Sequence, residues 1–276
     1  MKKVCVIGWP IKHSRSPLIH NYWLKLHRIE GSYERCAVTP DELSRFLASL
    51  ADRGYVGCNV TVPHKEKVFE AVRVDDPFTR SLGAVNTVYY KDGELHGTNT
   101  DGIGFLQNLK SRSPLWRASS GPATILGAGG AARAVVATLL AEGVEEIRIC
   151  NRTLERAETL VTMFGDRVRA IAWDRRTECL GECGVLVNTT TLGMTGAPPL
   201  DLALEQLPET ATVYDIVYAP LMTDLLKRAL TRSNPTVDGL GMLLHQAVPG
   251  FAQWFGVTPV VSDDLRALIV NDLEAQ

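Results

Sequence analysis

Ile125-Leu126-Gly127-Ala128-Gly129-Gly130-Ala131-Ala132 is the stretch of the sequence that decides the fold. The apolar residues Ala123 to Leu126 predict a short strand, and the helical period of Ala131 to Ala141 predicts a helix directly after it. The pattern G-x-G-x-x-[GA] therefore lies between a strand and a helix, which is the context that gives it meaning. Such a turn brings free backbone N–H groups and the helix dipole close to a pyrophosphate.

Predicted strands and helices alternate on both sides of this turn. Apolar strand-like runs alternate with segments of helical period, which predicts an α/β fold with mostly parallel sheets. Downstream, the predicted strands are Ile147 to Cys150, Val185 to Val187 and Thr212 to Ile216, with a helix at Leu154 to Phe164. Upstream, the predicted strands are Val4 to Gly8, Tyr33 to Val38, Gly57 to Val60 and Thr87 to Tyr90, with helices at Pro17 to Leu26 and Asp41 to Ala51.

The upstream half can build a sheet of its own, so the sequence predicts two α/β domains. The segment Ser111 to Pro122 is rich in Ser, Pro and Arg and is interpreted as the connection between the two halves. After Asp238 the apolar spacing becomes helical again, and Pro249 is expected to break or kink that helix. Periodicity does not say on which domain this terminal helix packs.

Composition excludes several classes of protein. The 276 residues carry 29 basic and 31 acidic side chains with no long run of either sign, so we expect no nucleic-acid partner. No apolar run reaches the ~20 residues of a membrane helix, and no signal peptide follows Met1, so a cytoplasmic protein is expected. The six cysteines are scattered and are interpreted as reduced thiols. Cys179 and Cys183 lack a second ligand pair, so no metal site is expected.

The end of the second predicted strand of the central domain bears on cofactor choice. Asn151-Arg152-Thr153 stands where a fold that prefers NAD usually carries Asp or Glu for the ribose hydroxyls. A planar, permanently charged guanidinium at Arg152 suits the 2′-phosphate of NADP instead, and Arg156 lies one helical turn further on. The alternative interpretation is a solvated basic pair at the start of a helix.

Four polar stretches accompany the predicted strands of the first half, several of them at the strand ends where open α/β sheets bind ligands, and Gly83 to Thr87 precedes the strand Thr87 to Tyr90. Taken singly each is an ordinary loop, and Ser16 in particular has the character of a helix N-cap before Pro17. The stretches are Gly8 to Pro17, Asn59 to Lys65, Gly83 to Thr87 and Gly97 to Gly102.

Together with later motifs, these stretches resemble the shikimate dehydrogenase family over nearly the whole chain. The motifs are GWPIKHSRSPLIHN, NVTVPHK, GAVNT, GTNTDG, GAGGAARA, NRT, NTTTLGM, YDIVYAPLMT and DGLGMLLHQA. The resemblance implies a substrate-binding and catalytic domain at residues 1–101, completed by terminal helices at 239–276. It also implies a doubly wound Rossmann domain for NADP(H) at 102–238, and reversible reduction of 3-dehydroshikimate to shikimate in chorismate and aromatic amino acid biosynthesis.

Matching motifs also imply residue roles. Ser14 and Ser16 would bind the substrate carboxylate, and Lys65 would be catalytic together with Asp101. The residues implied to hold the hydroxyls and ring are Thr61, Asn86, Asp101, Tyr218 and Gln246. Those implied to bind the cofactor are Gly127, Ala128, Gly129, Gly130, Ala131, Asn151, Arg152, Thr153, Arg156, Ile216 and Gly239. Thr191, where relatives often have Pro, and Pro249 depart from the family pattern.

Alternatives stay open at this point. An enzyme of the same family could use quinate or an aminoshikimate, and a regulatory protein could sense NADP(H) without turnover. A lyase or transferase that borrowed the fold is a weaker alternative, since fold does not fix function. His13 and His64, beside proposed site residues, are expected to have positional or surface roles. Among oligomers, a symmetric homodimer is the default expectation.

Overall fold

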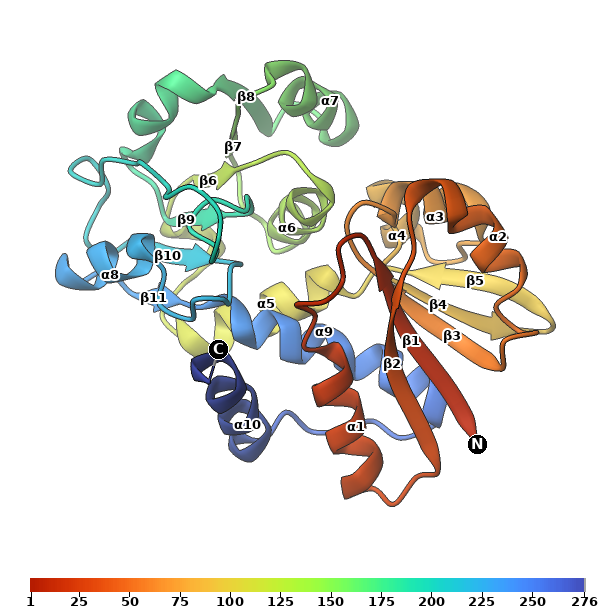
Figure 1. Cartoon of the computed structure of the whole chain (residues 1–276). Coiled ribbons are helices and arrows are strands. Elements are labelled where there is room, and N and C mark those ends of the chain that lie inside the picture. Colours follow the sequence, from red (N-terminus) through yellow and green to blue (C-terminus); the bar gives the residue numbers. More distant parts are fainter. Residues whose placement is uncertain (276) are drawn as a thin grey trace. The chain divides into compact units, whose positions relative to one another are not determined.

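The computed structural model describes residues 1–275, which form two compact units (Figure 1). The first unit combines Met1–Asp101 with Leu243–Glu274, and the second unit contains Gly102–Met242. Each unit has its own sheet, so the chain contains two α/β domains of the predicted class.

The first unit is built on a five-stranded mixed sheet in the order β2-β1-β3-β4-β5. Strands β2 (Gly31–Ala37), β1 (Lys2–Gly8) and β3 (Tyr55–Val60) run parallel, and β4 (Thr87–Lys91) is antiparallel to both of its neighbours, β3 and β5 (Glu94–Thr98). A buried cluster that includes Ile7, Leu50 and Val88 packs under one face of this sheet. The helices are α1 (Ser16–Leu26), α2 (Leu43–Ala48), α3 (Lys65–Ala71), α4 (Pro77–Leu82) and α10 (Asp263–Glu274).

This unit differs from the sequence-based prediction in the helix expected at 41–51 and in three elements that the sequence analysis does not predict, α3, α4 and β5. The helix expected at 41–51 begins as a 3-10 turn at Pro40–Glu42 and continues as the shorter α2, because Thr39 and Glu42 form a capping box. Strand β5 was not predicted. Asp92 and Gly93 have φ values of 52° and 82°, a left-handed pair that suits a tight hairpin turn and returns the chain against β4.

The second unit has six parallel strands in the order β11-β10-β9-β6-β7-β8. This is the doubly wound order of a Rossmann fold, with β6 (Ala123–Leu126) and β9 (Val185–Asn188) at the switch point. The other strands are β7 (Ile147–Asn151), β8 (Val168–Ala172), β10 (Thr212–Asp215) and β11 (Thr236–Val237). The helices are α5 (Asp101–Arg112), α6 (Gly130–Ala141), α7 (Leu154–Phe164) and α8 (Asp224–Thr231), with 3-10 turns η2 (Ala118–Ser120) and η3 (Trp173–Leu180).

The segment expected to connect the two halves does not do so, and the helix expected to break or kink at Pro249 does not break there. The segment 111–122 begins in the last residues of α5, lies inside the second unit and does not connect the units. Helix α9 (Gly239–Phe255) continues through Pro249. Although proline removes one helical hydrogen bond, the flanking side chains of Leu244 and Phe251 are buried to 1% and 0% exposure, and this packing holds the helix in one piece.

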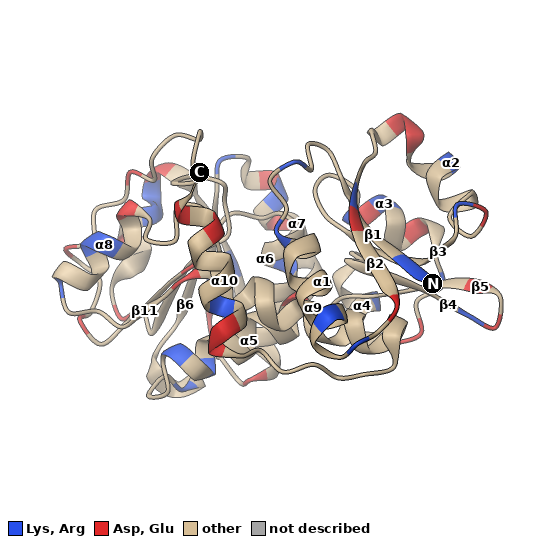
Figure 2. Cartoon of the chain, turned by 60° about the horizontal axis from the view of Figure 1, so that its bottom comes forward, with Lys and Arg blue, Asp and Glu red and all other residues tan. Residues whose placement is uncertain are grey.

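Charges of both signs are interspersed along the chain. In Figure 2, basic and acidic residues are scattered over helices, strands and loops of each unit. Within residues 1–275, no helix is long and apolar enough to span a membrane.

Candidate functional site

Lys65 and Asp101 form an ion pair in the first unit. Lys65 begins α3, shortly after β3 ends, and Asp101 follows β5 and begins α5. The ammonium of Lys65 donates to Oδ2 of Asp101 at 2.5 Å, with side-chain exposures of 16% and 8%. A shielded ion pair of this kind holds a proton donor in one place, which is the geometry that acid–base chemistry needs.

Asn86 joins this pair to Gln246. The Nδ2 group of Asn86 donates to Oδ1 of Asp101 at 2.8 Å and to Oε1 of Gln246 at 3.3 Å. Gln246 lies on α9, in the part that packs with the first unit. Four predicted site residues, Lys65, Asn86, Asp101 and Gln246, are therefore brought together from distant parts of the sequence.

The loop after β1 carries Ser14 and Ser16. Oγ of Ser14 accepts a hydrogen bond from the backbone N–H of Ser16 at 3.3 Å. The N-cap interpretation of Ser16 is wrong, because Arg15 occupies the cap position and Ser16 is the first helical residue. The side chain of Ser16 is buried at 5% exposure. Pro17 is the second helical residue, in the first turn, where a backbone N–H has no helical partner to lose.

Thr61 lies at the end of β3, beside the end of β1. Its backbone N–H donates to the carbonyl of Ile7 at 2.9 Å. A Cβ added to Gly8 would come within 2.5 Å of Cγ2 of Thr61, so only glycine allows this approach. The two strand ends that carry predicted site residues are therefore held side by side.

The nearby histidines have separate roles. His64 is buried at 1% exposure, and its ring bonds to the carbonyl of Val38 at 2.8 Å, whereas His13 is exposed. This agrees with the positional or surface role expected for both.

Sequence reasoning missed several polar residues around Asp101. Oδ1 of Asn99 accepts from the backbone N–H of Asp101 at 2.9 Å, and Thr100 donates to the carbonyl of Gln246 at 2.8 Å. Asn59 and Thr87 lie on the other side of Asn86, where Nδ2 of Asn59 donates to Oγ1 of Thr87 at 3.0 Å. All four stand inside motifs that the sequence already singled out, so their position in those motifs was the available signal.

In the second unit, the glycine turn connects β6 to α6. Gly127 has φ +105°, and a Cβ there would lie 2.7 Å from Oγ1 of Thr189. A Cβ on Gly129, the N-cap of α6, would meet no atom within 4 Å. The turn is therefore closed on the Gly127 side and open on the Gly129 side. That arrangement, at the switch point of the sheet, fits a bound pyrophosphate.

Arg152 and Arg156 follow the end of β7 and are both exposed. Within the part of the chain that the structure describes, neither guanidinium has a carboxylate at ion-pair distance. Nδ2 of Asn151 donates to the carbonyl of Thr153 at 2.7 Å and fixes the turn that carries Arg152. The two guanidinium groups can thus contact an anion at this corner of the sheet.

Ile216, directly after β10, and Gly239, the first residue of α9, lie against one another. A Cβ on Gly239 would be 2.2 Å from the carbonyl oxygen of Ile216, so no larger residue fits there without a shift. Tyr218 belongs to the same segment of the second unit.

Asp215, which the sequence reasoning missed, organises this segment. Its carboxylate accepts from Asn188 at 2.9 Å, from the backbone N–H of Val217 at 3.0 Å and from Thr223 at 2.7 Å. Burial raises the pKa of Asp215 to about 6, and the three hydrogen bonds oppose that rise.

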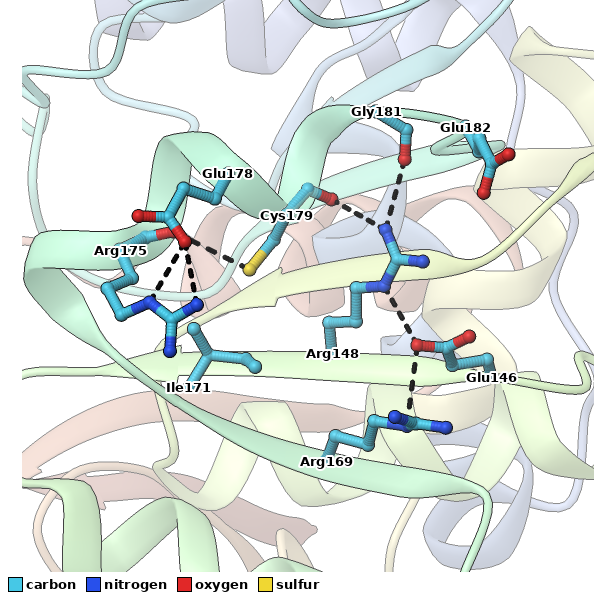
Figure 3. Close-up of a pocket in the computed structure, with 9 residues that line it drawn as sticks. All are labelled: Glu146, Arg148, Arg169, Ile171, Arg175, Glu178, Cys179, Gly181 and Glu182. Atoms are coloured by element: carbon cyan, nitrogen blue, oxygen red, sulfur yellow. Dashed lines mark hydrogen bonds and ion pairs between the residues drawn. The ribbon is translucent and has the colours of Figure 1, made fainter.

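A pocket of the second unit lies over β7, β8 and η3, and it is drawn in Figure 3. Its arginines are matched by glutamates: Arg148 donates to Glu146 at 2.9 Å, and Arg175 to Glu178 at 2.9 Å. None of its nine lining residues belongs to the glycine turn or to the Arg152 corner. Among the described residues, no group of three or more His, Cys, Asp or Glu side chains could hold a metal ion.

Family models match three parts of the chain. Residues 6–88 match the shikimate dehydrogenase substrate binding domain, residues 111–194 match shikimate / quinate 5-dehydrogenase, and residues 239–269 match the shikimate 5′-dehydrogenase C-terminal domain.

Individual relatives agree with these models. The shikimate dehydrogenase (NADP(+)) of Paramagnetospirillum magneticum is 56% identical over 267 residues, covering 96% of this chain and 97% of the relative. The shikimate 5-dehydrogenase of Thermus thermophilus, solved with NADP(H) and shikimate, is 34% identical, with a TM-score of 0.86 over 100% of this chain and 99% of that one. The quinate dehydrogenase of Corynebacterium glutamicum, solved with NAD, is 27% identical, with a TM-score of 0.89 over 98% and 99% of the two chains. On this identity and coverage, the chain belongs to the shikimate dehydrogenase family.

Proposed function

We propose that the protein catalyses the reversible, NADPH-dependent reduction of 3-dehydroshikimate to shikimate, a step of chorismate and aromatic amino acid biosynthesis. One observation carries the proposal: the shielded Lys65–Asp101 ion pair, with Asn86 and Gln246 beside it. A ketone reductase needs a proton donor at the carbonyl oxygen, where charge develops, and Lys65 is that donor.

Most of the proposed substrate ligands belong to the first unit, and Tyr218 belongs to the second. Ser14 and Ser16 hold the carboxylate, while the hydroxyls and ring contact Thr61, Asn86, Asp101, Tyr218 and Gln246. The proposed substrate domain comprises residues 1–101 completed by 239–276, and the proposed NADP domain comprises 102–238. The compact units support this division, with the change of unit inside α9 at Met242 and Leu243.

The cofactor is proposed to bind the second unit. The pyrophosphate lies on the turn Gly127 to Ala131, and the 2′-phosphate lies between Arg152 and Arg156. Asn151 and Thr153 shape the ribose corner, and Ile216 and Gly239 lie by the nicotinamide. The open side of Gly129 and the two arginines without carboxylate partners support this assignment. When bound, NADPH supplies the hydride that reduces the carbonyl carbon.

The chain's own residues manage the proton. Lys65, as an ammonium, stabilises the developing alkoxide and donates a proton to it. In the direction of oxidation, the neutral amine accepts the hydroxyl proton. Asp101 orients the ammonium through Oδ2, and Asn86 keeps Oδ1 occupied.

Steady-state rates with shikimate and quinate, each with NADP and with NAD, test the proposal. We expect the pair of shikimate and NADP to give the highest kcat/KM. A higher value with quinate would identify the protein as a quinate dehydrogenase. The fold does not decide between the two substrates, because a quinate dehydrogenase shares it. NADPH binding with no turnover of any of these acids would favour a cofactor-sensing protein.

The proposal also covers cellular location and assembly. We propose a cytoplasmic location, because the six cysteines of the protein are all free thiols, as expected in a reducing compartment. We propose a symmetric homodimer as the assembly, because two-fold dimers are the commonest oligomers. Sedimentation velocity across a concentration series would measure it, and a single monomer mass throughout would reject the dimer.

A further inference from the structure

Buried side chains connect Tyr33 to the Lys65–Asp101 pair by successive hydrogen bonds. Each member donates to the next, and the last acceptor holds the lysine. The bonds are Tyr33 Oη to Asn59 Oδ1 (2.6 Å), Asn59 Nδ2 to Thr87 Oγ1 (3.0 Å), Thr87 Oγ1 to Asn86 Oδ1 (3.0 Å) and Asn86 Nδ2 to Asp101 Oδ1 (2.8 Å).

The backbone fixes the direction of this chain of hydrogen bonds. Nδ2 of Asn59 also donates to the carbonyl of Asn86 at 3.1 Å, and since a carbonyl only accepts, the oxygen of the Asn59 amide must face Tyr33. The single proton of the Tyr33 hydroxyl therefore goes to Asn59.

A backbone hydrogen bond also fixes the orientation of the Asn86 amide, at the Asp101 end of the chain of hydrogen bonds. The backbone N–H of Thr100 donates to Oδ1 of Asn86 at 2.9 Å, so the nitrogen of that amide faces Asp101. Thr87 already accepts from Asn59, and its own proton goes to Asn86. Every proton in the chain of hydrogen bonds points toward the carboxylate of Asp101.

Burial gives the arrangement its effect. Thr87 is 0% exposed, Asn86 2% and Tyr33 3%, so no bulk water competes for these groups. In such surroundings aligned hydrogen bonds polarise one another, and an unmatched member is costly. The ring of Tyr33 is also held in place, because it stacks on His20 with centroids 4.1 Å apart and planes 2° apart.

We propose that Tyr33 and Thr87 are positioning residues that, through Asn59, lock the Asn86 amide with its N–H toward Asp101 and so leave the other carboxylate oxygen for Lys65. The inference rests on the proposed function, since it concerns the same proton donor. Among the described residues, neither side chain hydrogen-bonds to Lys65 or Asp101. Their hydroxyl groups act only through Asn86.

Thr87→Val tests this with little change of shape. We expect kcat for shikimate oxidation, measured where hydride transfer limits, to fall about three- to tenfold, the effect of one neutral hydrogen bond. KM for NADP should stay unchanged. Thr87→Ser, which keeps the hydroxyl, should restore kcat. Thr212→Val is the matched control, because it also removes a buried hydroxyl, bonded to Ser113 at 2.7 Å in the second unit, and should leave kcat unaltered.

A double-mutant cycle separates a connected chain of hydrogen bonds from two independent structural effects. Tyr33→Phe alone should also lower kcat. In Tyr33→Phe/Thr87→Val it should add nothing, because the connection is already broken at Thr87. Multiplying losses, or no rescue by Thr87→Ser, would overturn the inference. If Thr87→Val does not fold, Tyr33→Phe decides alone, and an unchanged kcat rejects the role.

A measurement without substrate keeps this test distinct from that of the proposed function. The side-chain amide protons of Asn86 in ¹⁵N-labelled, ligand-free protein should exchange faster with solvent in Thr87→Val than in the unmodified chain. Unaltered exchange would reject the locking role. If wild-type protein turns over neither shikimate nor quinate, the proposed function fails, and the Asn86 exchange still decides the inference.

Discussion

Lys65 and Asp101 stand 36 residues apart in the chain, yet the Lys65 ammonium lies 2.5 Å from Oδ2 of the Asp101 carboxylate. Because Oδ1 of Asp101 accepts from Asn86, only Oδ2 is directed to the ammonium. The carboxylate can therefore aim the lysine without enclosing it, and the remaining protons of the ammonium stay available to a substrate oxygen.

Replacing Lys65 by Met should abolish turnover and leave NADPH binding nearly intact. The lysine acts on the reacting oxygen, and a general acid contributes ~10²–10⁴-fold to rate. Stopped-flow rates and fluorescence titration with NADPH measure the two effects. Lys67→Met, an exposed lysine on the same helix, is the control and should keep full activity. A Lys65→Met enzyme with more than about a tenth of the normal kcat would contradict the role, since that loss lies below the range for an acid–base residue.

Arg152→Ala should weaken NADP(H) binding and scarcely change NAD binding. Charge-assisted hydrogen bonds to a phosphate contribute ~1.5–3 kcal/mol each, so the NADP dissociation constant should rise by about one to two orders of magnitude. Calorimetric titration with both nucleotides checks this, with the exposed Lys227→Ala as control. Equal losses for the two cofactors would mean that Arg152 supports the fold or the pyrophosphate instead.

Shikimate should be preferred over quinate by about ten- to hundredfold in kcat/KM, because the extra hydroxyl of quinate would arrive without a partner beside Ser14 and Ser16. Ser16→Ala should raise KM for shikimate more than it changes NADP binding. Ser81→Ala, an exposed serine on α4, serves as the comparison. If Ser16→Ala altered NADP binding more than KM for shikimate, Ser16 would not be a carboxylate ligand.

His20 should make the protein less stable in acid. Burial lowers the pKa of His20 from 6.5 to about 3, and neither ring nitrogen has a hydrogen-bond partner among the described residues. Between these pKa values the unfolded chain binds a proton that the folded chain does not, so the free energy of unfolding falls as pH falls below 6.5. From pH 7 to pH 5 the loss from this one group is about 2 kcal/mol.

Urea unfolding at several pH values measures that loss. His20→Phe, which cannot be protonated, should flatten the dependence on pH, while the exposed His13→Gln should retain it. An identical pH dependence in His20→Phe would mean that other groups cause the acid sensitivity.

Much of this architecture could be predicted from local patterns. Fully buried strands such as β6 have continuous apolar sequences, and the turn after β6 needs glycine for steric reasons that a sequence shows directly. Strand β8 (Val168–Ala172) was not predicted, because it lies at the sheet edge and Arg169 interrupts its apolar residues. The continuation of α9 through Pro249 could not be foreseen either, since it depends on packing by residues far away in the chain.

In the candidate site, too, some features could be predicted from the sequence and others could not. Lys65, Asp101 and the glycine turn stand in motifs whose chemistry is visible in the residue types. The links between them are not visible, because a hydrogen bond from Asn59 to Thr87 or from Asn188 to Asp215 joins residues 28 or 27 positions apart. Only the register of the strands brings such pairs together.

The division of α9 between two units has a consequence for how the protein is made. A ribosome releases Met1–Asp101 first, but that unit also contains Leu243–Glu274. The indole of Trp254 donates to the carbonyl of Val88 at 2.9 Å and covers Gly57, so part of the first sheet stays bare until the tail emerges. The nascent Gly102–Met242 unit, by contrast, has all its strands before then. The segment synthesised first thus belongs to the domain completed last.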